Sequence, residues 1–149
     1  MRLRLLLDVM CGGLVSYLRM CGHDAAYALD RGIEDDRDLL ELAREEDRTL
    51  VTRDVQLAGR AGDAILVESR DVREQLRELV AAGVPLALDE RPSVCGRCNG
   101  PLERVPADAS TPEYAPDPDG EAVWRCSACR QCFWRGSHWD DVRATLEGL

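Results

Sequence analysis

Four of the chain's seven cysteines have the spacing of ligands to one zinc ion. Cys95 and Cys98 form one C-x-x-C pair, and Cys126 and Cys129 form a second pair farther along the chain. Two such pairs supply four thiolates that can surround Zn²⁺ tetrahedrally, which leaves no open coordination position for catalysis. The spacing therefore predicts a structural zinc site.

Cys132 makes the second pair ambiguous, because Cys129 and Cys132 also stand in C-x-x-C spacing. We favour Cys126 and Cys129 as the ligands, because the residues after Cys129 can then form a turn before "CFW" resumes as a strand. The first pair is arranged in the same way, since "NG" follows it before "PLERV". Cys132 is therefore left out of the predicted site.

Three aspartates stand where strands end or where a helix begins. Asp8 ends the apolar run 3–8, and Asp54 follows the run 49–52. Because parallel strands present their carboxyl ends at one edge of a sheet, both carboxylates should emerge at that edge. Asp36 begins a predicted helix at the same edge and shares a helical face with Leu39 and Leu40. Asp36 is therefore expected to point toward the other two acids.

Three carboxylates at one edge form a hard oxygen site for Mg²⁺ or Mn²⁺. Such ions can activate water and stabilise the charge of a phosphoryl transition state. The alternative is that Asp35 or Asp36 and Asp54 only cap the helices that follow them. The residue pattern leaves both interpretations open.

The segments that must position these acids alternate between strand and helix signals. Strands are predicted at 3–8, 24–29, 49–52 and 64–69, and helices at 12–22, 35–48, 54–62 and 71–83. This alternation with short links predicts a three-layer α/β/α sandwich on a mostly parallel sheet. The predicted domain covers residues 1–90.

Residues 91–149 have a different character and contain both cysteine pairs. The proline-rich segment 106–121 predicts a loop, and the segment 137–149 predicts a helix capped by Ser137. So small a module buries little apolar surface, so it needs a metal to hold its fold. The second predicted domain is therefore a zinc ribbon with a C-terminal helix, at 91–149.

Charge and hydropathy limit the classes of function. The net charge is −9, with 12 arginines against 19 acids in residues 1–90 and 7 against 9 in residues 91–149. A broad basic surface for nucleic acid is excluded, so nucleic-acid chemistry would need metal ions or a few placed arginines. No apolar stretch approaches the ~20 residues that span a bilayer, and the first residues do not read as a signal peptide. We expect a cytoplasmic protein with no membrane partner.

Longer stretches of the chain resemble a known family. The stretches "LLLDVMCGGLVSYLRMCGHD", "DLLELAREEDRTLVTRD" and "FWRGSHW", with the paired cysteines, are similar to the Mut-seven C-terminal RNase domain, a PIN-like ribonuclease family. The resemblance covers essentially the whole chain. It implies a PIN-like core fused to a zinc ribbon, and a Mg²⁺- or Mn²⁺-dependent ribonuclease whose catalytic acids are Asp8, Asp36 and Asp54.

The resemblance also implies how substrate is held. The candidate RNA contacts are Arg53, Arg135 and His138, although a hydrogen-bonded role between the modules is the alternative for His138. The three aromatic residues of the last motif would pack the ribbon on the core; they are Phe133, Trp134 and Trp139. Besides RNA, a protein inhibitor or antitoxin-like partner is expected.

The chain departs from the family pattern at three places. Gly13 stands where a basic residue is common, Cys132 stands where an apolar residue is usual, and no fourth acid is evident after Asp54. The competing function is a non-catalytic adaptor, in which the ribbon binds RNA or protein while the acids cap helices.

Overall fold

The computed structural model describes residues 1–149 and confirms an α/β core built on a parallel sheet. Its four strands are β1 (Arg4–Leu7), β2 (Asp24–Tyr27), β3 (Thr49–Thr52) and β4 (Ala64–Leu66). Their order in the sheet is β2-β1-β3-β4, and every neighbouring pair is parallel. The three leucines of β1 are fully buried, as expected of a strand that is covered on both faces.

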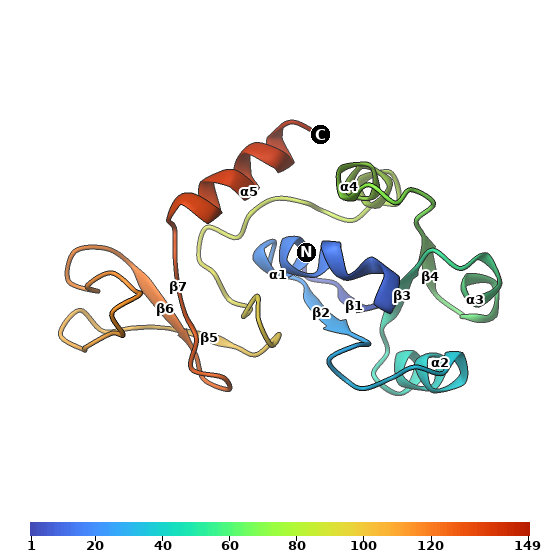
Figure 1. The fold of residues 1–149 in the computed structure, drawn as a ribbon, viewed down its shortest axis with the longest axis horizontal. Helices are drawn as coiled ribbons and strands as arrows, with labels where there is room; N and C mark the ends of the chain where they lie inside the picture. The colour runs from blue at the N-terminus through green and yellow to red at the C-terminus, as the bar shows by residue number, and fades with distance from the viewer.

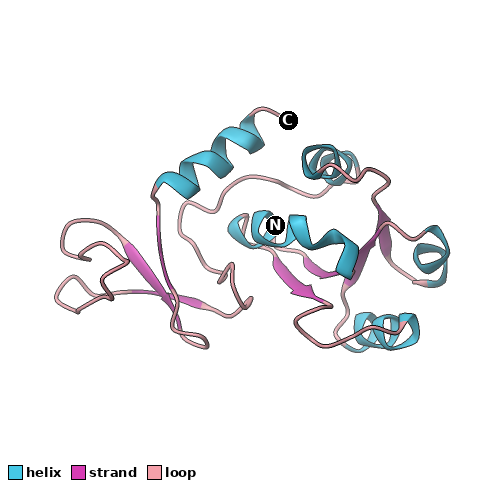
Figure 2. Ribbon diagram, in the orientation of Figure 1, coloured by secondary structure: helices cyan, strands magenta, loops and turns pink.

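Helices cover both faces of this sheet and form the predicted three layers (Figure 1, Figure 2). They are the 3₁₀-helix η1 (Val9–Leu14) and the α-helices α1 (Val15–Met20), α2 (Asp36–Glu45), α3 (Val55–Arg60) and α4 (Val72–Ala81). Side chains alternate along β1, so that Leu5 and Leu7 pack with η1, α1 and α4, whereas Leu6 packs with α2 and α3. Two apolar cores therefore hold the sheet between its helices.

The C-terminal part contains a second, antiparallel sheet, which we call the ribbon. Its strands are β5 (Leu102–Arg104), β6 (Val123–Cys126) and β7 (Cys132–Trp134), in that order. The segment 106–121 has no strand or helix, as predicted, and lies at the end of the molecule far from the parallel sheet (Figure 1). Helix α5 (Ser137–Glu147) then returns to the core, where Leu146 and Leu149 pack. No helix in the structure has the length and apolar character needed to cross a bilayer.

The predicted start of α5 is wrong by one residue. Ser137 is the first residue of the helix, and Gly136 takes the cap position without any side-chain hydrogen bond. The reason is the close packing of the chain against Trp134, because a Cβ atom at Gly136 would lie 2.7 Å from the indole Nε1. The turn before the helix therefore requires glycine at the position where a capping side chain would stand.

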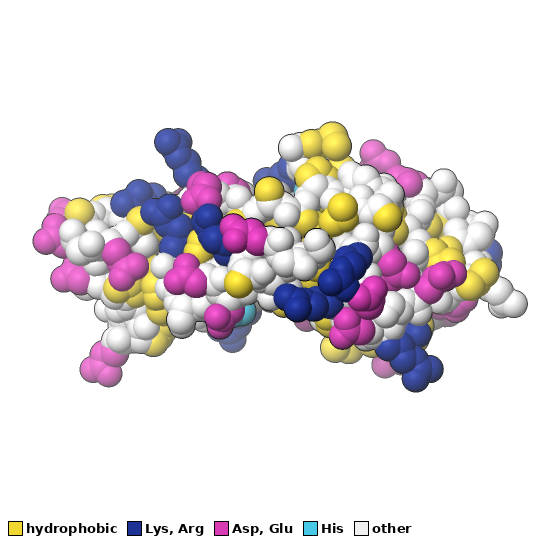
Figure 3. Space-filling view, turned by 90° about the horizontal axis from the view of Figure 1, so that it is seen from above, with side chains coloured by type: hydrophobic (Ala, Val, Ile, Leu, Met, Phe, Trp, Pro, Cys, Tyr) yellow, Lys and Arg dark blue, Asp and Glu magenta, His cyan; other side chains and the backbone are white.

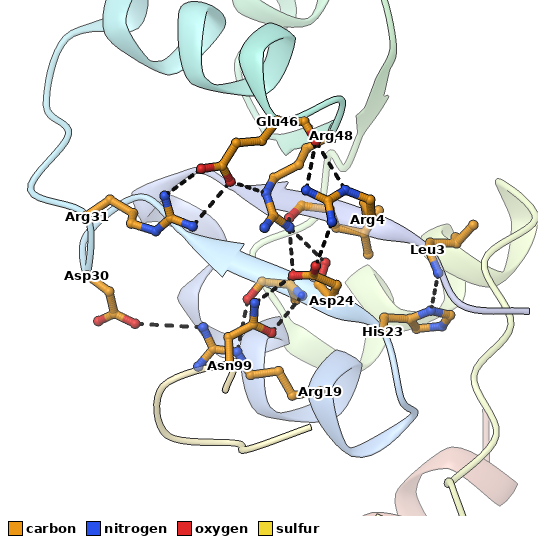
Figure 4. A network of polar contacts seen from close by, with 12 residues as sticks. Leu3, Arg4, Arg19, His23, Asp24, Asp30, Arg31, Glu46, Arg48 and Asn99 are labelled. Atoms are coloured by element: carbon orange, nitrogen blue, oxygen red, sulfur yellow. Dashed lines mark hydrogen bonds and ion pairs between the residues drawn. The ribbon is translucent and has the colours of Figure 1, made fainter. Parts of the chain in front are cut away.

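Asn99 joins the ribbon to the edge of the parallel sheet. Its Oδ1 accepts a hydrogen bond from the backbone N–H of Ala25 in the edge strand β2, at 2.9 Å. Its amide nitrogen donates to Asp24 Oδ1 at 2.6 Å, and Arg4 and Arg48 also bind Asp24 (Figure 4). Burial raises the pKa of Asp24, but the hydrogen bonds from Arg48 and Asn99 outweigh it, so the pKa lies below its ordinary value. The Asn99 side chain thus pairs the backbone N–H of Ala25 at the sheet edge, and it also binds the charged carboxylate of Asp24.

Arg19 makes a second link between the two sheets. Its side chain is 3 % exposed, and it donates to the carbonyl of Ala25 at 2.9 Å and to that of Gly96 in the ribbon at 3.0 Å. This buried guanidinium opposes separation of the two modules. If they moved apart, it would lose a carbonyl partner and be left with an unpaired buried donor. We therefore propose that the 1–90 and 91–149 domains are docked, not tethered.

Replacing Asn99 by glycine should loosen this docking. Asn99 has a φ of 71°, which glycine adopts without strain, so the substitution removes two hydrogen bonds and little else. We expect a loss of about 1–3 kcal/mol in the free energy of unfolding and faster proteolytic cleavage near residue 90. Arg130→Gly is the matched control, because Arg130 has a φ of 70° in the second cysteine turn and is exposed. Equal cleavage rates for the two variants would show that Asn99 does not hold the ribbon.

Candidate active site and metal centre

Asp8 and Asp54 lie at the topological switch point of the sheet. From β1 the chain passes to β2 on one side, and from β3 it passes to β4 on the other side. The connections therefore diverge between the adjacent strands β1 and β3, and such a divergence opens a crevice at the carboxyl ends of the strands. Asp8 directly follows β1, and Asp54 follows β3 after one intervening residue.

The hydroxyl of Thr52 connects these two acids. Thr52 is fully buried at the end of β3, and its Oγ1 donates to Asp8 Oδ2 at 2.8 Å. The same oxygen accepts a hydrogen bond from the backbone N–H of Asp54 at 3.0 Å. Thr52 therefore fixes the Asp8 carboxylate relative to the backbone of Asp54. Its position before "RD" is the only sequence signal of this role.

Both acids also cap helical segments. Asp8 Oδ1 accepts from the N–H of Val9 at 2.7 Å, and Asp54 Oδ1 accepts from the N–H groups of Gln56 and Leu57 at 3.0 and 3.1 Å. A carboxylate has about four lone-pair sites, so each acid keeps acceptor capacity for a cation or water. The capping bonds fix the orientation of both carboxylates and leave acceptor sites on their oxygens free.

Asp36 differs from the expectation that it would point toward the other two acids. It is the first residue of α2 and is exposed, as are Asp35 and Asp38. The face that it shares with Leu39 becomes buried only farther along the helix, because nothing covers the first turn. Asp35 is the N-cap, with Oδ1 accepting from the N–H of Arg37 at 3.0 Å. The three carboxylates at 8, 36 and 54 do not form a cluster of ligand atoms within reach of one ion, as the cysteines do.

Other polar residues lie at the same edge. Arg53 stands between Thr52 and Asp54, and its Nη2 donates to the carbonyl of Glu68 at 3.5 Å. Its Nε is buried without any hydrogen-bond partner. Glu68 follows β4 closely and is exposed, so it is an acid at this edge that we did not predict. The predicted strand 64–69 included Glu68, whereas β4 ends at Leu66, so the acid lies past the strand end and not within the strand.

The other two candidate RNA contacts lie elsewhere. Arg135 is exposed next to the ribbon, where its guanidinium lies 5.6 Å from the centre of the Trp124 ring and 3.7 Å from Glu90. His138, in the first turn of α5, is also exposed and lines a cavity between α1 and the ribbon. The structure therefore groups Arg53 with the acids and places Arg135 and His138 at the junction of the two sheets.

Four cysteines form a compact cluster that could hold zinc. The Sγ atoms of Cys95, Cys98, Cys126 and Cys129 all lie within 4.8 Å of one another. Cys95 and Cys129 are 3.6 Å apart and Cys98 and Cys126 are 3.5 Å apart, close to the ~3.8 Å that a tetrahedron of Zn–S bonds requires. Cys132 instead packs in the ribbon core with Val105 and Val123.

The two cysteine turns have the same backbone form. In the first turn the N–H of Asn99 donates to the carbonyl of Cys95 at 2.9 Å, and in the second the N–H of Arg130 donates to that of Cys126 at 2.9 Å. The residue after each pair has a positive φ, at 71° and 70°. This similarity agrees with the turn argument that favoured Cys126 and Cys129.

The thiols of the cluster are electrostatically suited to a cation. Burial raises the pKa of Cys95 to about 12, and it also raises that of Cys98. Burial also raises the pKa of Cys126, but hydrogen bonds from the backbone N–H groups of Cys129 and Ala128 outweigh it and lower the pKa to about 7. Cys126 thus ionises more readily than Cys95 or Cys98, and a bound cation would offset the cost of ionising the buried thiols.

Comparison with known proteins identifies the family. The model of the Mut7-C RNAse domain matches residues 3–146. The chain belongs to the Mut7-C RNase domain family. No curated protein and no solved structure matches significantly. Membership in this RNase family implies an RNA substrate, and the match extends over both the parallel sheet and the ribbon.

One departure from the Mut7-C pattern has a structural cause. Gly13, which stands where a basic residue is common, lies against α4, and a Cβ atom there would be 2.6 Å from Val72 Cγ2. η1 and α4 therefore approach too closely for a side chain at this position.

Proposed function

We propose that the protein is a metal-dependent ribonuclease that hydrolyses RNA phosphodiester bonds at the edge of the sheet formed by Asp8 and Asp54, with Asp36 completing the site. The observation that carries the proposal is the hydroxyl of Thr52, which bonds to both of the central acids at a switch point of the sheet. Mg²⁺ or Mn²⁺ bound by these carboxylates would activate water and offset phosphate charge. Membership in an RNase family supports the same conclusion.

The chain's own residues have separate tasks in this proposal. Asp8 and Asp54 would hold the divalent cations that offset phosphate charge, and their capping bonds keep both carboxylates fixed. Arg53 offers its guanidinium to a phosphate oxygen next to them. Glu68 is the candidate fourth acid, and Asp36, at the start of α2, would complete the set of carboxylates that a divalent cation could bind at this edge.

Replacing Thr52 by valine tests whether its hydroxyl positions the two acids for cleavage, in addition to stabilising the fold. Valine keeps the shape and β-branching, but it leaves the N–H of Asp54 unpaired and frees the Asp8 carboxylate. We expect a loss of about 1–3 kcal/mol in stability and about a tenfold loss in RNA cleavage. Thr49→Val is the matched control, because Thr49 Oγ1 donates to Asp63 at 2.6 Å at the opposite end of the same strand. A Thr52 variant that cleaves RNA as fast as the Thr49 variant would remove Thr52 from the site.

The second candidate function is a non-catalytic adaptor. The observation in its favour is that Asp8, Asp35 and Asp54 all cap helical segments, which alone would explain these residues. An assay of the zinc-loaded protein against single-stranded and structured RNAs, with Mg²⁺ or Mn²⁺, distinguishes the two. New RNA ends support the nuclease, whereas binding of RNA without cleavage under every metal condition supports the adaptor.

A further inference from the structure

A cavity of about 450 Å³ lies where the ribbon meets α1. Its ribbon side is formed by Phe133 and Trp134 of β7, with His138 and Trp139 from the first turn of α5. Its core side is formed by α1, with Arg19 among the lining residues. The volume falls in the range of sites that bind small organic groups, which also favour the interfaces between domains. Aromatic residues that were expected to close this junction instead line an opening in it.

The walls of this junction cavity combine aromatic rings with fixed polar groups. Phe133 and Trp134 are half-buried, so part of each ring is accessible. Arg97 Nη1 donates to Gln131 Oε1 at 3.1 Å and joins the two cysteine turns at the cavity wall. This bond uses the amide oxygen and leaves the amide nitrogen of Gln131 to donate elsewhere. Rings with a few placed donors and acceptors are the chemistry that receives an unstacked nucleobase.

The charges around the cavity suit a polyanion despite the acidity of the chain. Five acids of residues 91–149 fall in the loop 106–121, which lies at the far end of the ribbon (Figure 1). Outside that loop, this part of the chain has seven arginines and four acids. The guanidinium groups of Arg104 and Arg135 lie 5.5 and 5.6 Å from the Trp124 ring, and arginines lie among acids over the ribbon half (Figure 3). A phosphate backbone that meets the ribbon would thus be attracted here.

We propose that the junction cavity is a nucleobase subsite for single-stranded RNA, in which a base of the substrate stacks on Phe133 away from the acids. This inference rests on the proposed ribonuclease function for its RNA substrate. η1 and α1 run from Asp8, at the edge with the acids, to Arg19 and Met20 in the cavity wall. At ~1.5–2 Å per residue the two segments span at most roughly 20 Å, because η1 is kinked at Cys11. An RNA that occupies both must therefore be several nucleotides long and unpaired.

The test measures RNA binding apart from cleavage. In the Asp54→Asn background, without added Mg²⁺ or Mn²⁺, the affinity for a fluorescent single-stranded oligouridylate is measured by anisotropy. Phe133→Ala removes a ring, and Ser16→Trp fills the cavity from α1 while leaving the ribbon intact. We expect each to weaken binding about tenfold or more. Val80→Ala, on the exposed side of α4 and away from the cavity, should bind like its parent. The zinc content of each variant confirms that the ribbon is folded.

Photo-crosslinking with 5-iodouridine in the same oligonucleotide locates the base. Adducts on Phe133, Trp134 or Trp139 support the subsite, and adducts confined to other residues overturn it. Unchanged affinity of both Phe133→Ala and Ser16→Trp also overturns it, even if the parent cleaves RNA and the nuclease proposal stands. If the parent binds through this cavity but never cleaves, the subsite stands and the nuclease proposal fails. If the parent neither binds nor cleaves RNA, both fail.

Discussion

Replacing Asp54 by asparagine should reduce RNA cleavage by about 10²-fold or more while the fold and the zinc content survive. Asparagine caps helices as well as aspartate, so its Oδ1 can still accept from the N–H groups of Gln56 and Leu57. The substitution removes the negative charge that, in the proposed site, would bind a cation next to Asp8. Cleavage rates measured with Mn²⁺, with circular dichroism and elemental analysis of zinc, report these effects separately.

Asp35→Asn is the matched control for this variant. Asp35 also caps a helix, because its Oδ1 accepts from the N–H of Arg37 at 3.0 Å, and it is exposed next to Asp36. We expect cleavage by Asp35→Asn at close to the parental rate, whereas Asp8→Asn and Asp36→Asn should resemble Asp54→Asn. Parental activity in Asp54→Asn would leave capping as the role of this acid and favour the adaptor.

Loss of one zinc ligand should unfold the ribbon. Cys126→Ser replaces a ligand whose sulfur lies 3.5 Å from that of Cys98, and structural zinc contributes on the order of 10 kcal/mol to the folding of small modules. We expect about one zinc per chain in the parent and none in Cys126→Ser, with the C-terminal module unfolded. Elemental analysis and protease sensitivity of residues 91–149 measure this outcome.

Cys132→Ser tests the assignment of the ligands. Cys132 is 2 % exposed and packs with Val105 and Val123, so serine there should lower stability by only about 1–3 kcal/mol and leave zinc bound. Zinc lost from Cys132→Ser but kept in Cys126→Ser would reverse the assignment. Asn99 in the first cysteine turn accepts a hydrogen bond from the backbone N–H of Ala25 in β2. Removal of zinc from the parent should therefore also expose the backbone at the edge of β2.

The elements of the core were predictable because local pattern and tertiary environment agree. The apolar run that became β1 is buried on both faces of the sheet, where a continuous hydrophobic strand is stable. The helix begun by Asp36 carries acids in its first turn and Arg44 in its last, consistent with its dipole. The alternation of strand and helix segments predicted parallel strands. Their carboxyl ends lie at one edge of the sheet, so Asp8 and Asp54 were expected there.

The contacts that depend on distant partners were not predictable. Asn99 was read only as part of a turn, and its bond to Ala25 joins residues 74 positions apart in the chain. Helical periodicity placed Asp36 on the inner face, but the first turn of α2 has no neighbour to bury it. Ser137 had a capping side chain, yet the approach of Gly136 to Trp134 determined where α5 begins. In each case packing between segments overrode a local preference.

The most direct test of the account is the rate of RNA cleavage as a function of added Mn²⁺ or Mg²⁺, in zinc-loaded protein freed of other divalent ions. Zinc content is measured in the same samples, so that loss of the ribbon is not mistaken for loss of catalysis. We predict negligible cleavage without added metal, a saturable rise with either ion, and a response at least ~10²-fold lower in Asp54→Asn. Cleavage at the same rate with and without added metal, or equal rates for the parent and Asp54→Asn, would contradict a metal-dependent nuclease at this edge of the sheet.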